Sequence, residues 1–286
     1  MDFLPATIDT SLKKKDASLL LWRLRNIFPT RDKFQKRKVL FLLGSTGRVL
    51  FTANIQIMIK YKKEKLDLLK FKFQGIEKIE ENFAQAYQDM FVLSILDGKE
   101  GGYFLEVGAF DGAFLSNTYL LEKFFGWNGI ALDIKESAKV SFDAHRRTSK
   151  MVVGDALSLD YSDLLRENNS PKIIDYLQLD IEPQANTLEC LKRIPFDEYQ
   201  FRVITYETDY YDTSSSREES HRIMTESREI LKSHGYELVV GNVCNISKED
   251  PFEDWYVKPE LVDAEILEIF RSSDFYNNTS ETYMFL

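Results

Sequence analysis

From about residue 82 onward, short continuous apolar runs alternate with longer segments in which apolar residues recur every three or four positions. A short apolar run bounded by turn residues predicts a buried strand, whereas helical spacing predicts an amphipathic helix. The predicted strands cover residues 102–109, 129–134, 150–156, 172–182, 201–208, 236–243 and 282–286. The predicted helices cover residues 81–96, 116–125, 136–147, 158–168, 185–194 and 217–235.

This alternation of strands and helices predicts an α/β fold with a largely parallel sheet and right-handed crossovers. The last two of the seven predicted strands are separated by an irregular stretch, which fits a sheet whose final strand is antiparallel. In such sheets, ligands bind outside the carboxyl ends of the strands. The residues that end each strand are therefore the candidates for chemistry.

Residues 1–80 lack this rhythm and differ from the rest in charge. The chain carries a formal net charge of −9, yet residues 1–75 contain 17 Lys/Arg and 6 Asp/Glu, and residues 76–286 contain 20 and 40. This split predicts a basic, mainly helical extension over 1–80 and an acidic domain over 81–286. The segment "KKKDASLLLWRLRNIF" combines apolar residues with a basic face, which suits a helix on a membrane surface, against the body or against another subunit.

Composition narrows the class of protein further. Two cysteines, Cys190 and Cys244, without a CxxC spacing disfavour a cysteine zinc site and a disulfide framework. No secretory signal or membrane-spanning run is evident, because the apolar stretch 39–59 is broken by glycines, polar residues and Arg48. We therefore expect a cytoplasmic protein whose membrane contact, if any, is peripheral. The acidic domain disfavours nucleic acid as a partner.

The first strand ends in the segment "YFLEVGAFDG". Gly108 allows a tight turn and a close approach to a ligand, because it has no Cβ. The GxGxxG spacing of a dinucleotide site is absent, and the loop that follows is polar and acidic. Carboxylates there would stabilise the sulfonium and amino cations of S-adenosylmethionine and would repel a pyrophosphate. The candidate donor-binding residues of this turn are Glu106, Gly108, Ala109, Asp111 and Gly112.

The second and third strands also end in acids. Asp133 can accept hydrogen bonds from both ribose hydroxyls of a nucleoside, a role that NAD would use equally. Asp155, with Ala156 beside it, can accept a hydrogen bond from an adenine amino group. Each acid alone has an equally simple interpretation as a helix cap or a solvated loop residue, but their alignment along one sheet edge favours a ligand.

The fourth and fifth strands end in "LQLDIEP" and "ITYETDYY", whose acids are Asp180, Glu182, Glu207 and Asp209. Adjacent carboxylates repel unless one is protonated or a cation lies between them. Oxygen ligands suit Mg²⁺ or another divalent cation, so Asp180, Glu182 and Glu207 form a candidate metal site that would lower the pKa of a sugar hydroxyl. The metal-free alternative uses Glu207 or Asp180 as general base. His221, near the start of a long predicted helix, is a further candidate base.

Several segments together resemble one family of enzymes. The segments "AYQDMFVLSIL", "GYFLEVGAFDGAFLSNTYLLEKFFGWNGIALDI", "YLQLDIE", "FRVITYET", "ILKSHGYELV" and "EDWYV" resemble the FkbM family of methyltransferases in order and spacing over roughly residues 85–260. The combination of "VGAFDG", "SNTYLLE" and "GWNGI" is what makes the resemblance specific. The resemblance implies a class I methyltransferase fold with a Rossmann-like seven-stranded sheet. It also implies S-adenosylmethionine-dependent O-methylation, commonly of sugars or sugar-bearing natural products.

The resemblance also implies roles for individual residues. Glu106, Gly108, Asp111 and Asn117 or Thr118 would hold the donor, Asp133 would bind its ribose, and Asp180, Glu182 and Glu207 match the family's acids. Two positions depart from the family pattern. Pro183 stands where a glycine is usual, and Thr208 stands where members often carry histidine. The second departure weakens a histidine-assisted mechanism.

Trp255 and Tyr256 lie in a predicted irregular segment near the expected cleft. With Asp209 they are candidate substrate contacts, because aromatic faces pack on sugar C–H groups, although core packing is the simpler alternative. The sequence thus predicts an S-adenosylmethionine-dependent O-methyltransferase (EC 2.1.1.-) that acts on a sugar, glycan or glycosylated natural product. A nucleic-acid methyltransferase that uses the basic extension and a non-catalytic binding module remain as alternatives, and a homo-oligomer stays open.

Overall fold

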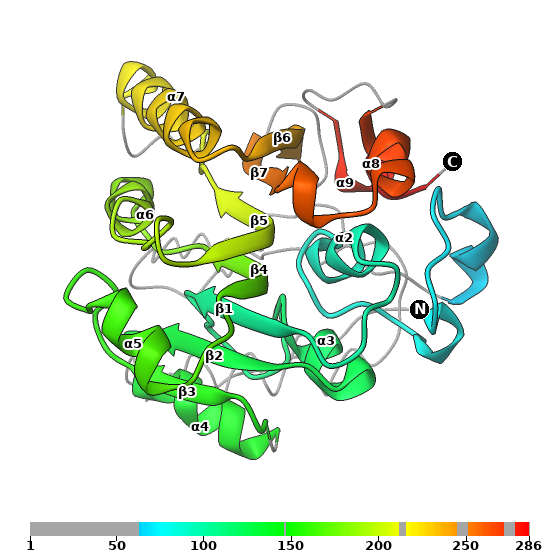
Figure 1. Cartoon of the computed structure of the whole chain (residues 1–286), viewed down its shortest axis with the longest axis horizontal. Helices are drawn as coiled ribbons and strands as arrows, with labels where there is room; N and C mark the ends of the chain where they lie inside the picture. The colour runs from blue at the N-terminus through cyan, green and yellow to red at the C-terminus, as the bar shows by residue number, and fades with distance from the viewer. Residues whose placement is uncertain (1–62, 146, 212–215, 245–250, 272–277, 286) are drawn as a thin grey trace, which may run out of the picture. The chain divides into compact units, whose positions relative to one another are not determined.

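The computed structural model of the chain describes residues 63–145, 147–211, 216–244, 251–271 and 278–285 (Figure 1). Packing divides the chain into two compact units, Met1–Ile57 and Met58–Leu286, and the described residues all belong to the second. The predicted helices and contacts of residues 1–62 lie outside the described residues. No helix within the described ranges is long and apolar enough to cross a bilayer.

Residues 63–80 pack with the body. They contain two 3-10 helices, η2 (Lys63–Leu68) and η3 (Ile76–Lys78). The side chains of Leu69 and Phe73 are buried in a core that they share with distant parts of the chain. Leu69 also forms a β-bridge with Phe285. Residues 63–80 therefore share a core with the residues that follow them, and the predicted extension over 1–80 stays a prediction.

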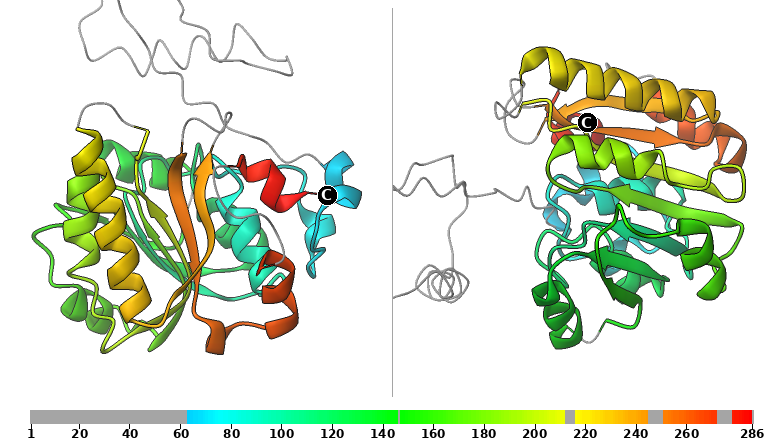
Figure 2. Two further views of the ribbon diagram at one scale, coloured as in Figure 1. Left: turned by 90° about the horizontal axis from the view of Figure 1, so that it is seen from above. Right: turned by 90° about the vertical axis from the view of Figure 1, so that its left-hand side faces the viewer.

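Seven strands form one sheet in the order β3-β2-β1-β4-β5-β7-β6 (Figure 2). They are β1 Tyr103–Val107, β2 Asn128–Asp133, β3 Lys150–Val153, β4 Ile173–Leu179, β5 Gln200–Glu207, β6 Glu237–Cys244 and β7 Pro251–Val257. The first five strands are parallel, and β7 is antiparallel to both of its neighbours. This is the Rossmann-like sheet of the class I methyltransferase fold, as the sequence predicted.

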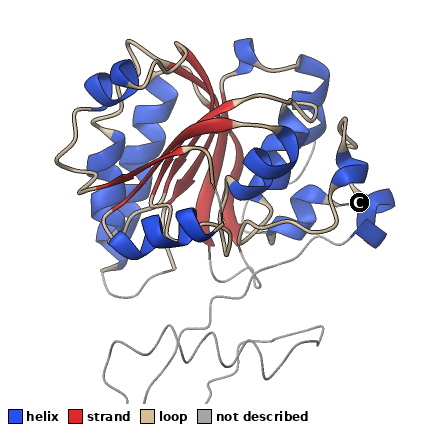
Figure 3. Ribbon diagram, turned by 90° about the horizontal axis from the view of Figure 1, so that it is seen from below, coloured by secondary structure: helices blue, strands red, loops and turns tan. Residues whose placement is uncertain are grey.

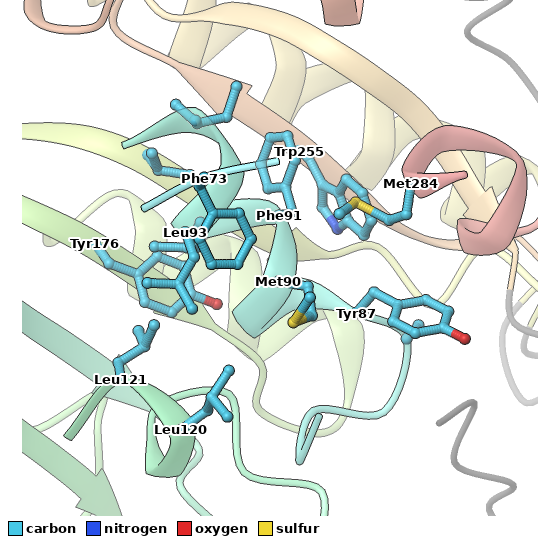
Figure 4. Close-up of a cluster of buried hydrophobic side chains, with 14 of the residues drawn as sticks. Phe73, Tyr87, Met90, Phe91, Leu93, Leu120, Leu121, Tyr176, Trp255 and Met284 are labelled. Atoms are coloured by element: carbon cyan, nitrogen blue, oxygen red, sulfur yellow. The ribbon is translucent and has the colours of Figure 1, made fainter. Parts of the chain in front are cut away.

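Helices cover both faces of the twisted sheet (Figure 3). They are α2 Gln88–Ile95, α3 Tyr119–Phe125, α4 Glu136–Ala144, α5 Tyr161–Glu167, α6 Gln184–Leu191, α7 Arg217–Ser233, α8 Ala264–Arg271 and α9 Ser280–Met284, with a 3-10 turn η4 at Pro259–Leu261. One core joins the sheet to α2, α3, α8 and α9, and a second core joins it to α5, α6 and α7. Figure 4 shows part of the first core, in which Phe91 of α2 stacks on Trp255 of β7 at 4.5 Å between ring centroids.

The seventh strand is not where the sequence predicted it. The predicted strand 282–286 overlaps helix α9, and the segment predicted to be irregular is strand β7. A five-residue segment made of one threonine and four apolar residues fits a strand or a helix equally well, so periodicity alone does not decide between them. Every residue of β7 is buried, including two acids. From sequence alone, two adjacent acids in a short segment predict an exposed loop, because the side chains that pair with them in the interior cannot be recognised.

Candidate active site

The turn after β1 lies against the ends of β2 and β4. The backbone N–H groups of Gly108 and Ala109 both donate to the carbonyl oxygen of Leu132, at 2.8 and 2.9 Å. Gly108 has a φ of +92°, and a Cβ added there would lie 1.6 Å from the carbonyl oxygen of Asp180. Only glycine fits this position, because any side chain would collide with the backbone of the neighbouring strand end.

Asp111 and Gly112 shape the loop that follows and attach it to α4. Asp111 accepts hydrogen bonds from the backbone N–H groups of Ala113 and Phe114 at 2.9 and 2.8 Å, and from the hydroxyl of Ser141 at 2.9 Å. A Cβ on Gly112 would lie 2.6 Å from the carbonyl oxygen of Ser141. Both predicted donor-binding residues therefore have a loop-shaping role.

Glu106 lies beneath this loop, pointing to the same face of the sheet as Phe104. Its carboxylate accepts a 2.6 Å hydrogen bond from the Thr118 hydroxyl and a second from the backbone N–H of Asn117. Burial raises the pKa of Glu106 to about 7. The side chain of Asn117 is 93% buried (7% exposed), and its Oδ1 has no hydrogen-bond partner among the described residues. A buried acceptor without a partner is costly unless a ligand supplies the donor.

Asp133 closes the second strand beside the same turn. Its Oδ2 accepts from the backbone N–H of Phe110 and its Oδ1 from that of Lys135, both at 2.8 Å. Each oxygen keeps a further lone pair for a ligand. The neighbouring Ile134 and Phe110 are apolar and exposed, at 68% and 51%. An apolar surface beside an acceptor suits a nucleoside.

The two predicted donor-binding residues after β3, Asp155 and Ala156, make contacts within the protein itself. Asp155 is exposed, and its oxygens accept from the backbone N–H of Leu157 and the hydroxyl of Ser158 at 2.9 and 3.1 Å. It therefore stabilises its own turn. Ala156 belongs to the core beneath α5 and α6.

Two carboxyl groups meet at the ends of β4 and β5. The side chains of Asp180 and Glu207 are hydrogen-bonded to each other. Burial, followed by the negative charge of Asp180, raises the pKa of Glu207 well above its usual range. Burial also raises the pKa of Asp180, against the opposing effect of the hydrogen bond from Glu207. Two neighbouring carboxyl groups repel unless one of them is protonated, so the pair fits a single proton shared between the two side chains.

Glu253 is a third carboxyl group of this cluster, and the sequence did not predict it. It pairs in register with Glu207 across the β5–β7 ladder and is 2% exposed. Its carboxyl accepts a 2.6 Å hydrogen bond from the indole N–H of Trp255 and another from the side chain of Gln88. Burial raises the pKa of Glu253 to about 8. Only the correct assignment of strand β7 would have revealed it.

Other predicted site residues lie elsewhere. The ring of His221, exposed on α7, is 3.2 Å from the Thr225 hydroxyl of the same helix, and its role as a base stays a prediction. Glu182 is exposed, and no group of three or more His, Cys, Asp or Glu in the described part of the chain is arranged to hold a metal ion. The predicted metal site at Asp180, Glu182 and Glu207 is therefore not found there.

Of the three predicted substrate contacts, two are core residues and one lies near the carboxyl pair. Trp255 and Tyr256 are 0% and 1% exposed and belong to the two opposite cores, so the core-packing alternative is correct. Asp209 is 8% exposed, and its negative charge raises the pKa of Glu207. It therefore lies near the carboxyl pair, and its role toward a substrate stays a prediction.

No protein-family model matches the chain, and no curated protein matches it either. Solved structures similar to it include an rRNA methylase from Streptococcus thermophilus, with 15% identity over 59% of this chain and 93% of that chain and a TM-score of 0.39. Fibrillarin from Aeropyrum pernix with bound S-adenosyl-L-methionine has 14% identity over 56% and 67%, with a TM-score of 0.40. A TehB-like SAM-dependent methyltransferase from Corynebacterium glutamicum has 14% over 60% and 88%, with a TM-score of 0.38. Similarity this low carries neither an activity nor a ligand over to this chain.

Proposed function

We propose that the chain is an S-adenosylmethionine-dependent O-methyltransferase that acts on a hydroxyl group of a sugar, glycan or glycosylated natural product. The observation that carries the proposal is the hydrogen-bonded carboxyl pair Asp180–Glu207. It lies at the sheet edge where the β1 turn packs against Asp180 through Gly108. A base and a candidate donor site are thus adjacent on one rim.

The residues of the rim fit the methyl donor. Asn117 Oδ1 is a buried acceptor that the donor's amino group can satisfy, and Glu106 beneath it can carry the compensating negative charge. The spare lone pairs of Asp133 suit the two ribose hydroxyls. The exposed faces of Ile134 and Phe110 suit the adenine ring. Bound there, the donor supplies an electrophilic methyl group on sulfur.

The carboxyl pair then acts on the acceptor. A new O–CH₃ bond forms as the S–CH₃ bond breaks, and the proton of the attacking hydroxyl passes to a carboxyl oxygen of the pair. Because Glu207 already holds one proton, the free oxygen of Asp180 is the available base. The rest of the catalysis is alignment of the two reactants in a shared orientation.

The variant Asp180→Asn tests the proposal in the full chain. It keeps the shape of the side chain and removes the base, so we expect turnover to fall by about 100-fold or more. Binding of the donor product S-adenosylhomocysteine, measured by calorimetry, should change little. Methyl transfer is measured by mass spectrometry on a panel of mono- and oligosaccharides and glycosylated natural products. Glu189→Gln, an exposed position on α6, is the matched control.

The outcomes separate the alternatives. A wild-type chain that binds neither donor nor donor product would refute the proposed enzyme. Donor binding without transfer to any acceptor would favour a non-catalytic module. Transfer to RNA or DNA, with binding that weakens steeply as salt rises, would favour the nucleic-acid methyltransferase that uses the basic extension.

A further inference from the structure

Arg147 is a buried cation that the proposed chemistry does not use. It follows α4, and its side chain is 0% exposed. Its guanidinium donates to Glu122 Oε2 at 2.7 Å, to Thr118 Oγ1 at 2.8 Å, to the carbonyl oxygen of Gly112 at 3.0 Å and to Ser116 Oγ at 3.4 Å. The ring of Phe142 lies 4.4 Å from its Cζ. A planar fork with this many donors can hold several acceptors in one fixed geometry, which a lysine cannot do.

These contacts hold the second half of the loop between β1 and α3. Gly112 lies near the middle of the loop, and Ser116 and Thr118 lie at its end, so one side chain spans residues 112–118. Glu122, on α3, neutralises the charge of Arg147. It also accepts from the backbone N–H of Thr148 at 2.6 Å and the hydroxyl of Ser149 at 2.5 Å. The remaining donors of Arg147 are therefore directed at the loop.

Thr118 connects Arg147 to Glu106. A hydroxyl has one proton, and that of Thr118 is donated to Glu106 Oε2 at 2.6 Å. Toward Arg147 it can only accept, which fixes the direction of both hydrogen bonds. The charged groups that face Glu106 are Arg147 and, from α3, Glu122; the Tyr176 phenol of β4 is also nearby. Arg147 favours the ionised form of Glu106, and burial and Glu122 oppose it.

We propose that Arg147 is a positioning residue of the donor site. It clamps the loop 112–118 and, through Thr118, keeps Glu106 oriented as an ionised acceptor for the donor's cationic groups. The inference rests on the proposed function, because the donor site is the reason to hold Glu106 charged. It makes Arg147 part of donor recognition without contact between Arg147 and the donor.

The test compares Arg147→Met, Arg147→Lys and Thr118→Val with the wild-type full chain. Binding of S-adenosylhomocysteine is measured by calorimetry from pH 6 to pH 9. We expect Arg147→Met to bind about fivefold more weakly near pH 7 and nearly tenfold more weakly at pH 6, since a one-unit rise in the pKa of Glu106 lowers its ionised fraction by these factors. The loss should shrink toward pH 9, where Glu106 ionises in both proteins. In the Glu106→Gln background, Arg147→Met should show no such pH-dependent loss.

A second readout needs no ligand. Amide hydrogen exchange over residues 112–119 should be faster in Arg147→Met than in wild type, because the loop loses its clamp. Arg147→Lys keeps the charge but not the fork, so it should restore part of the pH profile and little of the exchange protection. Arg166→Met, which removes an exposed arginine of α5, is the control and should match wild type in both measurements.

The outcomes that overturn the inference are distinct from those that overturn the enzyme. Equal affinity of Arg147→Met and wild type, or a loss that is uniform from pH 6 to pH 9, would refute the positioning role while leaving donor binding in place. If Arg147→Met does not fold, Thr118→Val decides, because it removes the hydroxyl that links Arg147 to Glu106 and keeps the contacts of Arg147 with Glu122 and Gly112. An unchanged pH profile in Thr118→Val would then refute the role. A wild-type chain that does not bind the donor product refutes the proposed function itself.

Discussion

Gly108 is the residue whose replacement the structure constrains most tightly. Gly108→Ala would place a Cβ 1.6 Å from the carbonyl oxygen of Asp180, at a φ of +92°. We expect a loss of about 3 kcal/mol or more in the free energy of unfolding, and loss of donor-product binding. The control is Gly101→Ala, where φ is +66° and nothing lies within 4 Å of the added Cβ. It should cost only the roughly 1–2 kcal/mol of a left-handed alanine. Equal costs in urea unfolding would contradict the close packing.

The buried carboxyl Glu253 predicts a dependence of stability on pH. Burial raises its pKa from the ordinary value to about 8, so the folded chain holds a proton that the unfolded chain releases above its own lower pKa. The stability contribution of Glu253 is thus full at acid pH and is lost as pH rises to about 8. The slope is about 1.4 kcal/mol per pH unit for one group.

Glu253→Gln removes this titration and keeps an acceptor for the Trp255 indole. Relative to wild type, the variant should gain stability steadily between pH 5 and pH 8 in urea unfolding. Glu260→Gln, an exposed position after β7, should show no such trend. A difference between Glu253→Gln and wild type that stays constant over this range would show that Glu253 is ionised in the folded chain.

Some residues of the candidate site could be predicted from the sequence, and others could not. Glu106, Asp133, Asp180 and Glu207 lie at or next to the carboxyl ends of parallel strands, and the rule that ligands bind there selected them as candidates. Arg147 and Glu253 were not predicted, because a charged residue in an amphipathic segment usually faces solvent. Their burial depends on partners from distant segments, such as Glu122 and Gln88. No local pattern contains that information.

Strand β7 shows the same limit for an element. Its side chains alternate, with Glu253 and Trp255 on one face and Asp254 and Tyr256 on the other, but both faces carry an acid. Asp254 is accommodated because Arg228 of α7 donates to it at 2.8 and 2.9 Å, and the backbone N–H of Asn242 donates at 2.8 Å. The parallel strands, by contrast, are mainly apolar and could be predicted directly.

Asp254→Asn tests how much this pair contributes to holding α7 on the sheet. Breaking a fully buried ion pair costs about 3–5 kcal/mol, and we expect about 2 kcal/mol here because Arg228 keeps partial contact with water. The matched control is Asp143→Asn, which breaks the exposed pair with Lys139 on α4 and should cost about 0.2–1 kcal/mol. Both are measured by urea unfolding. Similar costs for the two variants would show that the Arg228–Asp254 pair behaves as a surface contact.

The whole chain combines a basic N-terminal part with an acidic body. Residues 1–57 hold 11 Lys/Arg and 4 Asp/Glu, whereas the unit from Met58 onward contains the seven described strands, the two described cores and the residues of the candidate site. The fold therefore does not require the basic part, because folding free energy comes mainly from the burial that a domain achieves within itself. The basic part can still matter for where the protein binds in the cell. A basic segment binds anionic surfaces, and this binding weakens as the salt concentration rises because salt screens the charges.

Deletion of residues 1–57 should accordingly leave the unfolding midpoint in urea and the affinity for S-adenosylhomocysteine unchanged. Sedimentation with vesicles then separates the two interpretations of the basic part. If it lies on membranes, the full chain will sediment with anionic vesicles at low salt but not with neutral ones, and the shortened chain with neither, because its own charge is repelled by the anionic surface. If it packs on a protein surface, neither chain will sediment. A shortened chain that unfolds or loses donor-product binding would show that the body is not self-sufficient.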